Sequence, residues 1–139
     1  MPRQPYHAVL DELPKFESLD GFFRRSAITA DHALMQVIWL EPGHPPVPTD
    51  QHAHDQTVFV FSGSLQLVLN GTDRYVVNPG ECLYIPGNVP HQATALGDEP
   101  LHALDIFAPV RQEHLPMVEH QLANERAAVG DSAQTPTPT

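Results

Sequence analysis

The chain has 139 residues and a formal net charge of −10, because 17 acidic side chains face only seven lysines and arginines. This length predicts one domain with a single core, and the charge argues against a nucleic-acid partner, since affinity for phosphates comes largely from cations. We expect a soluble cytoplasmic protein without a membrane partner, because the chain has no 18-residue apolar run, no signal-peptide core and a single cysteine, Cys82.

Short β-type segments follow an N-terminal arm at regular spacing. Residues 1–20 carry scattered apolar positions among prolines and acids, and predict an arm with one short strand or turn. The pattern becomes β-like from Arg24, and further strands are predicted over residues 33–40, 57–61, 64–69, 75–77, 82–85, 92–96 and 101–107. Asn70-Gly71 predicts a type I′ hairpin turn. About eight such strands predict an all-β sandwich or barrel over residues 21–115.

After residue 115 the sequence no longer predicts strands. Leu115-Pro116 predicts the start of a helix with proline in its first turn, running over residues 116–130 and ending near Gly130. Residues 131–139 consist mainly of small and polar side chains with two prolines. Such a segment cannot build a core, so we expect it to be a disordered tail.

Histidines at two places have the spacing of a metal site. Residues 50–56 read Asp-Gln-His-Ala-His-Asp-Gln, and His91 ends a segment rich in glycine and proline. Imidazole is the commonest protein ligand for transition metals. We therefore expect His52 and His91 to share one divalent ion with neighbouring side-chain oxygens. Such a set can hold Fe(II), Mn(II), Zn(II), Ni(II) or Co(II), and the sequence does not choose among them.

The segment that ends at His91 resembles the second signature of the cupin superfamily. That signature reads Gly-x5-Pro-x-Gly-x2-His and is matched by Gly80, Pro86 and His91, with Asn88 in place of the second glycine. The resemblance implies a cupin double-stranded β-helix, which is a jelly-roll barrel, with the short N-terminal arm and the C-terminal helix outside it.

The first cupin signature, His-x-His-x3-4-Glu-x6-Gly, can be aligned in two registers. Gly63 places Gln56 at the glutamate position, so without a gap the histidine pair falls on Asp50 and His52; with residues deleted it falls on His52 and His54. We prefer the ungapped register, because positions 50 and 52 of a strand face the same side and three residues remain for the turn before Gln56. The predicted metal ligands are then Asp50, His52, Gln56 and His91, with His54 as the alternative ligand or a group at the rim.

The end of the predicted barrel resembles a narrower group of cupins. Asp105-x-Phe107-x-Pro109-x-Arg111 is similar to the ending of small cupins like the pectin-degradation proteins that convert unsaturated uronates to their keto forms. The resemblance implies that Asp105 and Arg111 act on a substrate, that Phe107 lines the pocket and that the protein is a homodimer. The apolar positions Leu65, Leu67 and Leu69 could supply the dimer surface.

Three functions fit these residues. The first is a metal-dependent enzyme that acts on a small polar carbonyl or enol compound, such as a sugar or keto acid, by keto–enol isomerisation or a related lyase step. Asp105 or His54 would move a proton, and Arg111, one of six arginines, would hold a substrate carboxylate. The second is a non-haem Fe(II) dioxygenase, because two histidines and a carboxylate resemble its metal site. The third is a cupin that binds a small molecule without chemistry.

Overall fold

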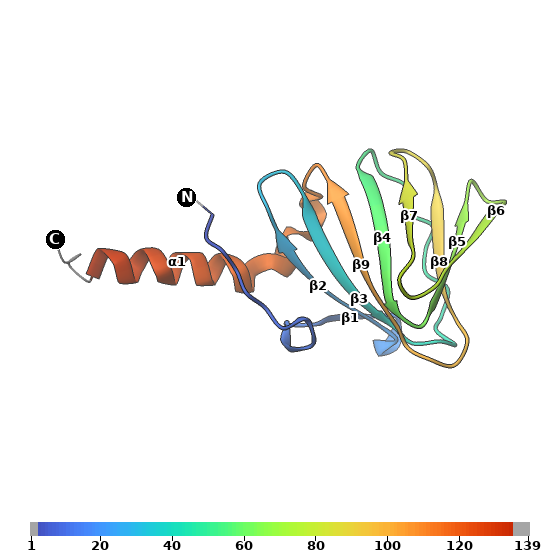
Figure 1. Cartoon of the computed structure of the whole chain (residues 1–139), viewed down its shortest axis with the longest axis horizontal. Coiled ribbons are helices and arrows are strands. Elements are labelled where there is room, and N and C mark those ends of the chain that lie inside the picture. The colour runs from blue at the N-terminus through green and yellow to red at the C-terminus, as the bar shows by residue number, and fades with distance from the viewer. Residues whose placement is uncertain (1–2, 135–139) are drawn as a thin grey trace.

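The computed structural model describes residues 3–134, which form two antiparallel sheets that face each other as a barrel (Figure 1). The larger sheet has the strand order β1-β2-β3-β9-β4-β7, with bounds β1 Phe16–Ser18, β2 Phe23–Thr29, β3 Leu34–Leu40, β9 Leu101–Ala108, β4 Asp55–Ser62 and β7 Cys82–Ile85. The smaller sheet has the order β6-β5-β8, with bounds β6 Asp73–Val77, β5 Ser64–Leu69 and β8 His91–Leu96. The predicted all-β jelly-roll barrel is confirmed.

The strands lie close to the positions that the sequence predicts. All seven segments predicted from residue 33 onward are strands whose ends differ by no more than two residues from the prediction. Asn70 and Gly71 both have positive φ, at 54° and 75°, and the Thr72 amide donates to the Leu69 carbonyl at 3.2 Å. These are the features of the predicted type I′ turn.

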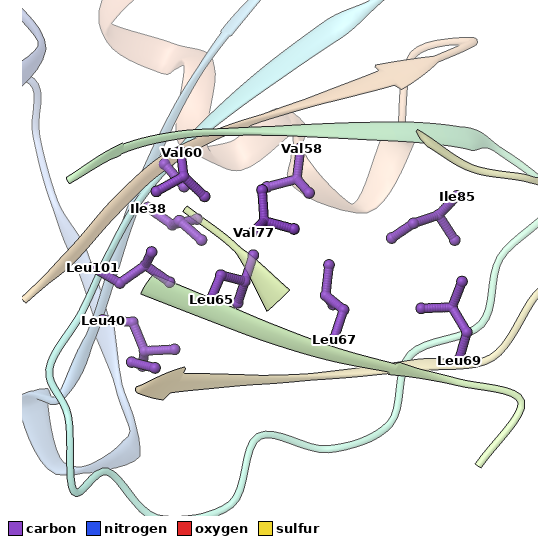
Figure 2. Close-up of a cluster of buried hydrophobic side chains, with 12 residues drawn as sticks. Ile38, Leu40, Val58, Val60, Leu65, Leu67, Leu69, Val77, Ile85 and Leu101 are labelled. Carbon is purple, nitrogen blue, oxygen red and sulfur yellow. The ribbon is translucent and has the colours of Figure 1, made fainter. Parts of the chain in front are cut away.

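Alternating apolar side chains from both sheets fill the barrel. Figure 2 shows this cluster, in which leucines of β5 point toward valines of β4. Leu65, Leu67 and Leu69 are only 1%, 3% and 7% exposed. The prediction that these three leucines supply a dimer surface is therefore wrong, because the period-two alternation of β5 turns them into the core.

Segments before and after the barrel strands pack against the larger sheet. In the N-terminal arm, Leu13 packs against Val37 and Trp39 on the outer face of β3. After β9, a 3₁₀ helix, η3 (Gln112–Val118), packs against β2 and leads into helix α1 (Glu119–Gln134), which extends away from the barrel (Figure 1). No helix among residues 3–134 is long and apolar enough to cross a membrane.

The C-terminal helix differs from its predicted bounds of 116–130. Pro116 lies inside η3, so the α-helix begins later, at Glu119, and it continues through Gly130 to Gln134. A glycine inside a helix costs only about 1 kcal/mol relative to alanine, which does not end a helix by itself. Residues 131–134, predicted to be disordered, are thus helical, and the remaining residues of that predicted tail, 135–139, lie outside the described residues.

Candidate functional site

A cavity of about 430 Å³ lies inside the barrel, between the two sheets. Its apolar lining comes from both sheets and includes Ile38, Leu65 and Phe107. Its polar lining consists of Ser18, Arg25, Gln36, Thr49, Asp50, Gln56, His91, Asp105, Arg111 and His114. An apolar cavity of this size with a few converging polar groups is typical of a site for a small molecule.

Backbone pairing brings Asp50 and His91 together at this cavity. The Asp50 amide donates to the His91 carbonyl at 2.8 Å, and the His91 amide donates back to the Asp50 carbonyl at 2.9 Å. His52 follows two residues later, and its carbonyl accepts from the Asn88 amide at 2.6 Å. Asp50, His52 and His91 each offer one side-chain ligand atom, and these three atoms all lie within 4.8 Å of one another.

The turn before His91 needs the residues found there. A Cβ on Gly87 would lie 2.3 Å from the Ala53 carbonyl oxygen, so only glycine allows this close approach to the segment that carries His52. Asn88 has a φ of 67°, the left-handed conformation that asparagine tolerates better than most residues. Asn88 thus takes a conformation that glycine adopts freely, at the position where the second signature has glycine.

Both imidazoles point their Nε2 atoms at a common place. Nδ1 of His52 lies 2.9 Å from the His54 carbonyl oxygen, and Nδ1 of His91 lies 2.9 Å from the Val89 carbonyl oxygen. A carbonyl oxygen only accepts, so each Nδ1 carries the hydrogen, and in the neutral ring each Nε2 has a free lone pair. This is the arrangement that orients metal-binding histidines in proteins.

The Gln56 amide adds an oxygen to the same place. Its Nε2 donates to Asp105 Oδ1 at 3.0 Å, which turns its Oε1 toward His52 Nε2, 3.1 Å away. Asp50 Oδ2 lies 3.8 Å from the same His52 nitrogen. Lone pairs of neutral His52, Gln56 and Asp50 therefore face one another, and a bound cation would relieve their repulsion. The residues present fit a divalent metal ion with nitrogen and oxygen ligands.

Asp105 faces the cavity, as expected from the strand pattern. It lies in β9 opposite Gln36 of β3, and its Oδ2 accepts from Gln36 Nε2 at 2.9 Å while its Oδ1 accepts from Gln56. Its exposed fraction is 5%, and burial raises the pKa of Asp105 to about 6 although both hydrogen bonds favour the charged form. Asp105 is therefore a buried carboxyl group without an ion pair among the described residues.

Arg111 lines the cavity but is bound to carboxylates of the chain itself. Its two Nη atoms donate to the two carboxylate oxygens of Asp50 at 2.8 and 3.0 Å, and its Nε donates to Glu113 at 2.6 Å. Burial alone would raise the pKa of Asp50, but the bonds from Arg111 hold it below its ordinary value. Arg111 was expected to hold a substrate carboxylate. In the structure it is instead the counter-ion of Asp50.

The structure does not place the His54 side chain in the cluster of possible ligand atoms. Its ring lies 5.6 Å from the ring of His52, but the ligand atoms that lie together belong to Asp50, His52 and His91. The functional part of His54 is its carbonyl, which fixes the His52 ring. The four residues of the ungapped register therefore converge, whereas the geometry gives the His54 side chain no role as a ligand or proton carrier.

The sequence patterns did not single out Arg25 and His114, which are among the polar residues that line the cavity. His114 stands beside Arg111 in a segment with no strand pattern, so no periodicity indicated that it faces the cavity. Arg25 lies in β2, whose inward-facing positions include Phe23. Period-two alternation counted from Phe23 would have placed Arg25 inside, had the start of that strand been known.

Comparisons with known proteins agree with this fold. A family model described as the cupin domain matches residues 36–107. The pectin degradation protein KdgF of Dickeya dadantii (strain 3937) is 29% identical over 105 residues, which cover 76% of this chain and 94% of that protein. The structure of KdgF from Halomonas sp. has a TM-score of 0.65 at 22% identity, with 76% of this chain and 95% of that chain covered. A structure of FeII HppE has a TM-score of 0.62 at 15% identity, with 74% of this chain and 60% of that chain covered.

Proposed function

Since the chain belongs to the cupin family, we propose that it is a metal-dependent enzyme that isomerises a small carboxylated sugar derivative between its enol and keto forms, or carries out a related lyase step. One observation supports a bound metal ion. Two imidazoles, fixed by backbone carbonyls, turn free lone pairs toward oxygens of Gln56 and Asp50. The likeness to a pectin degradation protein supports a uronate as the substrate.

The residues of the site divide into two groups. Asp50, His52, Gln56 and His91 would hold the ion, which when bound would polarise a carbonyl or enol oxygen as a Lewis acid. Asp105 would move the proton between carbon and oxygen, because it is a carboxyl group that lines the cavity and has no cation bound to it. Phe107 lies edge-on to the His52 ring at 5.5 Å and forms an apolar wall beside the ligands.

A dioxygenase is the second candidate. Asp50, His52 and His91 form a set of two histidines and one carboxylate, which is the ligand set of many non-haem Fe(II) oxygenases. Binding without chemistry is the third candidate, and it would need the same cavity but no proton carrier.

One experiment separates the three functions. We expect protein purified without a histidine tag to contain a divalent metal by elemental analysis, and to consume an unsaturated galacturonate without oxygen. The metal-free protein should be inactive, and activity should return when the metal is added back. Oxygen uptake with Fe(II) and a strict need for oxygen would identify a dioxygenase. Tight binding of the sugar acid without turnover under either condition would identify a binding protein.

We also expect the protein to form a homodimer, through a surface other than the buried leucines of β5. Phe59, Phe61 and Tyr84 are 37%, 46% and 55% exposed on the outer side of β4 and β7. Light scattering should give twice the 15.4 kDa chain mass, and Phe61→Glu should lower this mass toward one chain. Tyr75→Glu, at an exposed aromatic of the other sheet, serves as the control. A wild-type mass of one chain at micromolar concentration would contradict the expectation.

A further inference from the structure

The cavity contains a second arginine that the chain itself does not neutralise. Arg25 reaches the cavity from β2, and no carboxylate within residues 3–134 lies at ion-pair distance from it. Its guanidinium carbon lies 5.1 Å from the centre of the Phe23 ring, and its Nε is buried without a hydrogen-bond partner. Burial is the larger cause that lowers the pKa of Arg25, and the positive charge of Arg111 is the second cause. An arginine side chain nevertheless stays charged in proteins.

Arg25 and Arg111 therefore differ in what they can still bind. Arg111 already donates three hydrogen bonds to Asp50 and Glu113. Arg25 donates no side-chain hydrogen bond to the described part of the chain. Arg25 is only partly buried, but its Nε is a buried donor without a partner, which is costly unless an anion in the cavity accepts from it. The planar fork of arginine suits a carboxylate.

A second polar group of the same cavity is unused as well. His114 is 7% exposed, its ring packs 5.4 Å from the Phe107 ring, and its Nε2 is buried without a partner. Burial first, and then the positive charges of Arg111 and Arg25, lower the pKa of His114 to about 4. The ring is thus neutral near pH 7 and can donate one N–H bond to an anion beside Arg25.

We propose that Arg25 and His114 form a carboxylate-binding subsite, in which the guanidinium of Arg25 carries the charge recognition and His114 Nε2 adds one hydrogen bond. The inference rests on the proposed function, since it assigns the substrate carboxylate to these two residues. The sugar ring would then extend across the cavity toward His91 and Gln56, which line the same space.

The test compares two probes that differ in one group. Galacturonate and galactose share the same ring, but only galacturonate carries a carboxylate. Calorimetry on the protein as isolated should show that the wild type prefers galacturonate. Arg25→Gln should weaken galacturonate binding about 10- to 100-fold, the usual effect of losing a hydrogen-bonded charge partner, and leave galactose binding unchanged.

Matched variants separate binding from folding. Arg24→Gln is the control, because Arg24 is the next residue of β2 and lies near Glu41, at 3.7 Å, outside the cavity lining. It should bind galacturonate like the wild type. If Arg25→Gln does not fold, Arg25→Lys takes its place in the test. Arg25→Lys keeps the charge and should lose only part of the affinity for galacturonate. His114→Phe keeps the packing against Phe107 and should cost about 2- to 10-fold for galacturonate alone.

The outcomes distinguish this inference from the proposed function. Full galacturonate binding by folded Arg25→Gln or Arg25→Lys overturns the inference, as does a wild type without preference for galacturonate. If Arg111→Gln removes the preference and Arg25→Gln keeps it, the carboxylate binds at Arg111 and only the inference fails. If the preference depends on Arg25 but the metal-loaded protein turns over no uronate, the inference stands and the proposed function fails.

Discussion

Replacing Asp50 with alanine is expected to remove most of the bound metal. Asp50 is the single anionic member of the proposed ligand set, and its carboxylate also neutralises Arg111 through two hydrogen bonds. Asp50→Ala therefore deletes a ligand and leaves a positive charge beside the ion. Losing merely a hydrogen-bond partner of a ligand costs about 10- to 100-fold in metal affinity, so we expect a loss above about 100-fold here.

His54→Ala is the matched control for this loss. The His54 side chain is not part of the cluster formed by Asp50, His52 and His91, and its contact with the His52 ring comes from the backbone carbonyl, which alanine keeps. Metal content by elemental analysis of untagged protein should then be nearly that of the wild type. The reverse pattern, with metal lost in His54→Ala and kept in Asp50→Ala, would show that the histidine pair is His52 and His54.

The strands of the barrel could be predicted because each carries its own local signal. Alternation of apolar and polar residues marks a strand, and glycine, proline and asparagine mark the turns between strands. Asn70-Gly71 is an example in which two residues suffice to fix a turn. The same alternation does not tell which face of an isolated strand is buried, and this is why the leucines of β5 were assigned to a surface.

The cluster of Asp50, His52 and His91, which could hold a metal ion, could be predicted because it lies within one short segment plus His91. Contacts between distant segments could not. Arg111 and Asp50 are 61 residues apart, and their pairing depends on the path of the chain between β9 and η3, which packs against β2. The Gln36–Asp105 contact depends on the register of β3 against β9. Neither the path of a 3₁₀ helix nor a strand register follows from composition or spacing, so the partner of Arg111 came only with the structure.

Asp105→Asn should lower turnover of the substrate by about 10²- to 10⁴-fold, the usual contribution of a general acid or base. Asparagine has the same shape, and its Oδ1 can still accept from Gln56 Nε2. Its Nδ2 would face Gln36, whose Oε1 is buried without a partner in the wild type. Gln36 can therefore flip its amide and accept the new hydrogen bond, which makes this variant unusually conservative for a buried site.

The expected result is an inactive protein that is otherwise intact. Because the Gln56 amide keeps its direction, Asp105→Asn should retain metal content, and its melting temperature should stay within a few degrees of the wild type. Asp105→Ala is the contrasting variant: it frees both Gln36 and Gln56, so it should lose stability and some metal together with activity. If Asp105→Asn turns over substrate at the wild-type rate, Asp105 only orients Gln56, and the proton must be moved by another group of the cavity.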